Sequence, residues 1–152
     1  MLNGMKKLLV FLCFGFFNFR AVLSQSVSPC DIETLAVTES NIYKLTDKEI
    51  KDFLLTFDYR CKNNIEYSEY SNELLFVVLE NHTKSFIKII RKEKKSLNLD
   101  KILSEIARPI HDSIDLNWIL IKVDNIKSGG KLKRQIVENL KKAQNLIRVG
   151  MF

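Results

Sequence analysis

Residues 46–61 read TDKEIKDFLLTFDYRC and contain the clearest helix signal in the chain. Thr46 and Glu49 have the spacing of a capping box, in which the Thr hydroxyl and the Glu carboxylate satisfy backbone N–H groups that the first turn leaves unpaired. Apolar residues then recur every three or four positions, at Ile50, Phe53, Leu54, Phe57 and Cys61. Because this spacing places them on one face, the sequence predicts an amphipathic helix over about residues 47–61.

Similar periodicity predicts helices along the rest of the chain. They are expected over residues 66–80, over 83–91, from Asn98 to just before Pro109, around 116–123, and from Gly129-Gly130 to just before Gly150. Residues 74–79 are apolar on every side, which favours a helix in the middle of a bundle. Periodicity alone leaves a buried strand open there and at residues 118–123. The sequence therefore predicts an all-α fold, an irregular bundle of about five to six short helices.

The N-terminal residues have the pattern of a secretory signal peptide. Lys6 and Lys7 precede an apolar run of ten residues, LLVFLCFGFF, at positions 8–17. A membrane span needs about 20 apolar residues, so this run is short for an anchor. We expect a signal peptide over residues 1–24, cleaved after Ser24, with an uncleaved anchor as the alternative. An N-terminal arm with one short helical turn (25–45) and a single helical domain (46–149) would follow.

The number of cysteines also indicates export from the cytosol. The chain has three cysteines, and cleavage of the leader would remove Cys13, leaving Cys30 and Cys61. An even pair in an oxidising compartment predicts a disulfide, while two buried free thiols are the alternative. Since no Cys-x-x-Cys occurs, a redox or zinc role is disfavoured. We therefore expect a secreted or periplasmic protein.

The charge is unevenly distributed along the chain. Residues 25–80 contain 5 Lys/Arg and 11 Asp/Glu, a net charge of −6, whereas residues 81–152 contain 16 and 7, a net charge of +9. The basic residues concentrate in 84–95 and 127–142. A basic end of this kind can dock on an anionic envelope surface, unless the two halves pack together and neutralise each other. Nucleic acid would use the same charges, but export argues against it.

The sequence offers little catalytic chemistry. Its two histidines, His82 and His111, stand at predicted helix boundaries, where capping or surface roles are usual. No His-Glu-x-x-His, Gly-x-Ser-x-Gly or P-loop pattern occurs, so no catalytic, cofactor-binding or metal-binding residue is predicted. Two carboxylates facing each other across a cleft remain the open enzymatic alternative. Asn81-His82-Thr83 is a glycosylation sequon.

The remaining functional signal concerns contact with other molecules. Tyr67 and Tyr70 lie at helical spacing and predict a contact patch, because tyrosine combines an apolar ring with a hydrogen-bonding tip. Most other aromatic residues, Trp118 included, are expected in the core. The sequence favours a non-enzymatic binding, accessory or inhibitor module whose partner is another exported or envelope protein. The alternative is a carrier that holds an apolar ligand between its helices near residues 74–79.

Overall fold

The computed structural model describes residues 27–111 and 113–150, so the expected signal peptide and its cleavage position lie outside the described residues. Within these ranges the fold is all-α, as predicted, with seven α-helices, one 3-10 helix and no strand. The elements are α1 (Ile32–Ser40), α2 (Asp47–Leu55), η1 (Tyr59–Asn63), α3 (Ile65–Asn81), α4 (Thr83–Glu93), α5 (Leu99–Ile106), α6 (Leu116–Asp124) and α7 (Gly130–Arg148).

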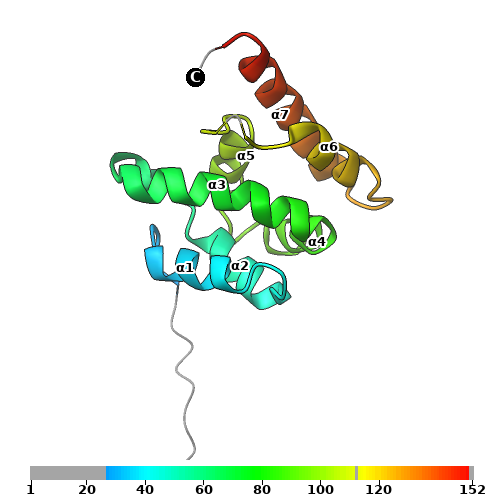
Figure 1. The fold of residues 1–152 in the computed structure, drawn as a ribbon. Helices are drawn as coiled ribbons and strands as arrows, with labels where there is room; N and C mark the ends of the chain where they lie inside the picture. Colours follow the sequence, from blue (N-terminus) through cyan, green and yellow to red (C-terminus); the bar gives the residue numbers. More distant parts are fainter. Residues whose placement is uncertain (1–26, 112, 151–152) are drawn as a thin grey trace, which may run out of the picture.

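Helix α3 occupies the middle of the bundle (Figure 1). Helices α1 and α2 lie on one side of it, and α5, α6 and α7 lie on the other, while α4 contacts both α2 and α7. Leu75, Val78 and Leu79 of α3 are fully buried. The prediction that residues 74–79 form a central helix is thus confirmed. Residues 118–123 are helical as well, because they belong to α6.

Helix α2 begins at the predicted capping box but ends earlier than predicted. The Thr46 hydroxyl accepts a hydrogen bond from the Glu49 N–H, and the Glu49 carboxylate accepts from the Thr46 N–H. The helix stops at Leu55, and Asp58 then caps η1 by accepting from the Arg60 N–H at 2.8 Å. The predicted helix over 47–61 is therefore wrong beyond residue 55. The side chain of Asp58 binds a backbone N–H and begins a separate 3-10 helix there.

The N-terminal arm is more ordered than predicted. Where one short turn was expected, the structure has the nine-residue helix α1, capped by Asp31, whose carboxylate accepts from the Glu33 and Thr34 N–H groups at 3.0 and 3.3 Å. Only Leu35 and Thr38 of this helix are buried. Because so few apolar residues face inward, the sequence periodicity is weak. The helix is stabilised instead by its cap and by its packing on α2 and α3.

Cys30 and Cys61 form a disulfide with a Cα–Cα distance of 5.5 Å, in agreement with the predicted pairing. The bond joins the segment just before α1 to η1. Cys61 was expected at the end of the helix predicted over 47–61, but α2 has already ended at Leu55. The Cys30 N–H also donates to the Thr56 carbonyl at 3.0 Å. The disulfide and this hydrogen bond therefore fix the start of the arm against the rest of the bundle.

Among residues 27–111 and 113–150, no helix combines the length and the hydropathy that a membrane span requires.

Candidate interaction surfaces

The predicted contact patch at Tyr67 and Tyr70 does not form as expected. Tyr67 is only 1% exposed, and its hydroxyl donates to the Thr56 hydroxyl at 2.8 Å. Tyr70 is partly buried, and its hydroxyl donates to the Glu39 carboxylate of α1 at 2.6 Å. Tyr67 is therefore a core residue, since it shares a helical stripe with Leu74 and Val78. Both tyrosines connect α3 to neighbouring segments of the same chain.

Burial of Tyr67 raises the pKa of its phenol to about 12. An unfolded chain ionises tyrosine near pH 10, so the free energy of unfolding should fall as the pH rises from about 10 toward 12. We expect Tyr67→Phe to remove part of this alkaline loss, and to cost about 1 kcal/mol at pH 7 through the lost hydrogen bond. Urea denaturation of both proteins at neutral and alkaline pH checks this. An unchanged alkaline slope would contradict it.

Helix α6 presents an apolar outer face. Trp118 is 46% exposed and Ile121 is 51% exposed, whereas Leu116, Ile119 and Val123 on the opposite side are buried. The Lys122 ammonium lies 5.1 Å from the centre of the Trp118 ring and 3.5 Å from the Glu80 carboxylate. The indole therefore stands at the surface beside an ordered cation. We call Trp118 and Ile121 the α6 face.

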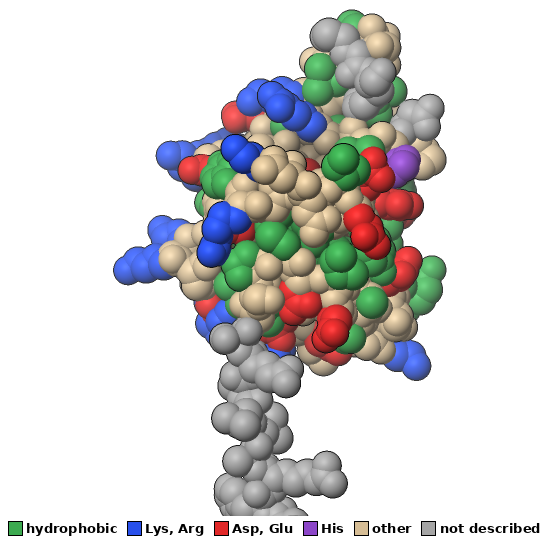
Figure 2. All heavy atoms as spheres, turned by 90° about the vertical axis from the view of Figure 1, so that its left-hand side faces the viewer, with side chains coloured by type: hydrophobic (Ala, Val, Ile, Leu, Met, Phe, Trp, Pro, Cys, Tyr) green, Lys and Arg blue, Asp and Glu red, His purple; other side chains and the backbone are tan. Residues whose placement is uncertain are grey.

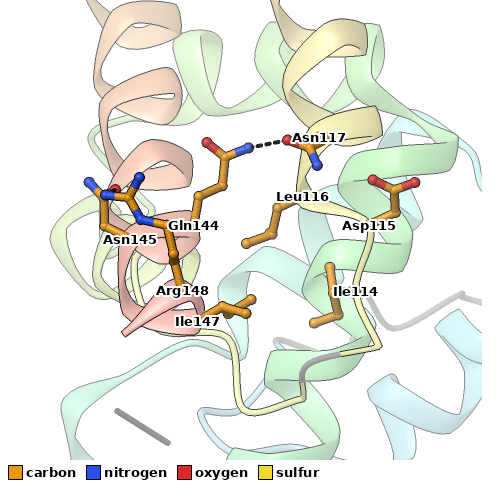
Figure 3. Close-up of a pocket in the computed structure, with 8 residues that line it drawn as sticks. All are labelled: Ile114, Asp115, Leu116, Asn117, Gln144, Asn145, Ile147 and Arg148. Carbon is orange, nitrogen blue, oxygen red and sulfur yellow. Dashed lines mark hydrogen bonds between the residues drawn. The ribbon is translucent and has the colours of Figure 1, made fainter. Parts of the chain in front are cut away.

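A groove lies between the start of α6 and the end of α7 (Figure 3). Ile114 and Leu116 lie on one side and Ile147 on the other, and the Gln144 amide donates to the Asn117 side-chain oxygen at 2.8 Å across it. Its volume is about 420 Å³. Arg148 and Asp115 complete its polar rim. The groove thus offers apolar walls with hydrogen-bonding groups at the start of α6, the helix that carries the α6 face.

A second surface is basic and surrounds the Gly129-Gly130 turn. One hollow beside this turn is lined by Arg91, Lys94 and Lys131. The hollow on the other side is lined by Lys127, Arg134 and Lys141, together with Lys133. Gly129 and Gly130 line both hollows. We call the six residues Arg91, Lys94, Lys127, Lys131, Arg134 and Lys141 the basic surface; all six are exposed.

The two oppositely charged halves neutralise each other only in part. Lys88 pairs with Asp47 at 2.5 Å, and Lys51 pairs with Glu93 at 2.8 Å, so two ion pairs join α2 to α4. On the face shown in Figure 2, most Asp and Glu side chains gather toward the right and lower part, while most Lys and Arg project from the left. Acidic and basic side chains are thus largely segregated on this face.

The two histidines occupy structural or surface positions. The His82 Nε2 atom lies 2.5 Å from the Ile42 carbonyl oxygen, and His111 lies 3.9 Å from the Glu73 carboxylate. Within the described part of the chain, His, Cys, Asp and Glu side chains form no group of three or more that could hold a metal ion. The contacts of His82 and His111 thus give no geometric reason to assign either of them to chemistry.

Comparison with protein-family models, with curated proteins and with solved structures finds no match to this chain.

Sequence reasoning missed the α6 face, although the sequence contains a signal for it. Trp118 was expected in the core with the other aromatic residues. In a helix, however, Leu116, Ile119 and Val123 form one stripe, and positions 118 and 121 fall outside it. Applying the helical period to Trp118 itself predicts an exposed indole.

Proposed function

We propose that this protein is a non-enzymatic binding module that holds another exported protein through the α6 face and the adjoining groove. The half-exposed Trp118 is the observation that carries the proposal. Tryptophan is among the residues that dominate binding energy at protein interfaces. Ile121 extends the apolar contact by one helical turn.

The surroundings of the α6 face indicate the chemistry of the partner. Lys122 lies against Trp118, and Arg148 lines the groove at the start of the same helix. A complementary surface would insert an apolar side chain next to the indole and place acidic groups around that contact, since interfaces combine an apolar centre with a polar rim. An amphipathic helix or loop with acidic flanks has this pattern.

Two observations support a location outside the cytosol. The Cys30–Cys61 disulfide is typical of proteins that fold in an oxidising compartment, because cytosolic thiols are kept reduced. The sequence pattern of residues 1–24 adds the expectation of a signal peptide. Both are consistent with a secreted or periplasmic partner.

The proposal predicts that Trp118→Ala weakens partner binding by about 30-fold or more, because truncating a central interface residue costs about 2 kcal/mol or more. Tagged wild-type protein is used to isolate the partner from its native source, and the dissociation constant is then measured with purified components. Tyr43→Ala is the matched control, since Tyr43 is 82% exposed and lies between α1 and α2. Equal affinities of all three proteins would contradict the proposal.

The carrier of an apolar ligand remains the second hypothesis. The same purified protein can be extracted with organic solvent and analysed by mass spectrometry. A stoichiometric lipid would favour the carrier, while a ligand-free protein that binds its partner through Trp118 would favour the binding module.

A further inference from the structure

We propose that the basic surface docks the protein onto the surface of an anionic phospholipid bilayer. This function is separate from partner binding, because it uses Arg91 and Lys94 at the end of α4 and Lys127, Lys131, Arg134 and Lys141, which lie just before α7 and along it. None of these residues belongs to the α6 face.

The fold brings these cations together from segments that are distant in sequence. Helices α4 and α7 contact each other, and the Gly129-Gly130 turn lies between the two basic hollows. Among the described residues, none of the six makes an ion pair within 4.0 Å. The hollows contain two acidic residues, Asp124 and Glu138, and the Asp124 carboxylate already lies 3.7 Å from Lys133. The surface therefore carries a large uncompensated positive charge.

The start of α7 adds to this charge. Gly129 and Gly130 have φ values of 150° and 52°, conformations that favour glycine, and they turn the chain directly into the helix. No side chain caps this helix, and its first turn contains no acidic residue. Lysine and arginine near the positive end of a helix are unfavourable, whereas an anion there is favourable. An anion bound at the start of α7 therefore offsets the repulsion between the positive end of the helix and the cations beside it.

The distribution of the charges favours a bilayer over a compact anion. The six side chains are long, exposed and spread over two hollows, so they do not converge on one point. A fluid layer of anionic headgroups adapts to such a surface, and each nearby Lys or Arg strengthens binding additively. The hollow beside α4 is also lined by the partly buried Leu99 and Leu132, against which the glycerol region of a lipid can lie.

Co-sedimentation of the secreted protein, recovered after export and removal of its leader, with vesicles tests this proposal. Wild-type protein should bind phosphatidylcholine vesicles that contain phosphatidylglycerol, fail to bind pure phosphatidylcholine vesicles, and lose binding as salt is raised. Lys94→Gln/Lys131→Gln/Arg134→Gln should lower the partition coefficient about 100-fold. The matched control, Lys44→Gln/Lys62→Gln/Lys84→Gln, removes the same charge from exposed positions elsewhere and should change it less than about 3-fold.

Three outcomes would overturn the proposal. The first is equal binding of the wild type to both kinds of vesicle, and the second is an equal loss of vesicle binding in the two triple variants. The third is stoichiometric binding of inorganic phosphate that is lost in Lys94→Gln/Lys131→Gln/Arg134→Gln, because such binding would indicate a compact anion site. Trp118→Ala should bind vesicles like the wild type. Failure of the vesicle experiment therefore leaves the partner-binding proposal intact, and failure of the partner-binding experiment leaves the bilayer proposal intact.

Discussion

Replacing Cys30 and Cys61 together by serine is expected to lower the free energy of unfolding by about 3–4 kcal/mol. The disulfide closes a loop of 31 residues, and a cross-link of this span restricts the unfolded chain by about that amount in the chain-entropy model. The loss should be concentrated at α1, where only Leu35 and Thr38 are buried. Urea denaturation measures the total, and hydrogen exchange of residues 32–40 measures the local effect.

Reduction provides the control for the disulfide. A thiol reductant should destabilise the wild-type protein to the level of the double serine variant and leave that variant unchanged. Peptide mapping without reduction should recover the peptide with Cys30 linked to the peptide with Cys61. Two separate peptides with free thiols would show that the bond does not form in the protein.

Asn72→Ala is expected to lower the free energy of unfolding by about 3 kcal/mol, since two part-buried backbone groups lose their partners at about 1 kcal/mol each and a small cavity remains. Asn72 is fully buried in α3. Its amide donates to the Glu105 carboxylate at 2.7 Å and to the Arg108 carbonyl at 3.1 Å, and its oxygen accepts from the Ile110 N–H at 3.0 Å. One side chain thus fixes the end of α5 and the following turn.

Asn81→Ala is the matched control for Asn72, because Asn81 belongs to the same helix but is exposed. Its amide donates only to the Val77 carbonyl one turn earlier. We expect this variant to lose less than about 1 kcal/mol. Chemical denaturation with circular dichroism compares the two variants. Similar losses for Asn72→Ala and Asn81→Ala would show that the Asn72 hydrogen bonds do not support the fold.

Local sequence signals predicted most of the helices in this fold. The capping box at Thr46, the pair Gly129-Gly130 and the proline at 109 each act within a few residues, so their effects are readable without tertiary structure. Helix α1 and the early end of α2 were not predicted. The first depends on packing against α2 and α3, and the second on Asp58 competing for backbone N–H groups, so helical periodicity alone did not reveal either.

The candidate surfaces were less predictable than the fold. The basic regions 84–95 and 127–142 were visible in the sequence, but the contact between α4 and α7 that joins them is a tertiary feature. Tyr67 was placed at the surface because its hydroxyl suits a wet interface. The structure instead satisfies that hydroxyl internally through Thr56, which lies 11 positions earlier. Helical position was a better guide than residue type for both Tyr67 and Trp118.

The central claim is that the α6 face contacts a partner protein, and site-specific photo-crosslinking in the native source tests it most directly. A photoreactive residue placed at Ile121 should form a covalent adduct with one protein, and the same residue placed at Tyr43 should not. Adding Trp118→Ala should reduce the Ile121 adduct. Crosslinks from Tyr43 that equal those from Ile121, or an Ile121 adduct that survives Trp118→Ala undiminished, would contradict the claim.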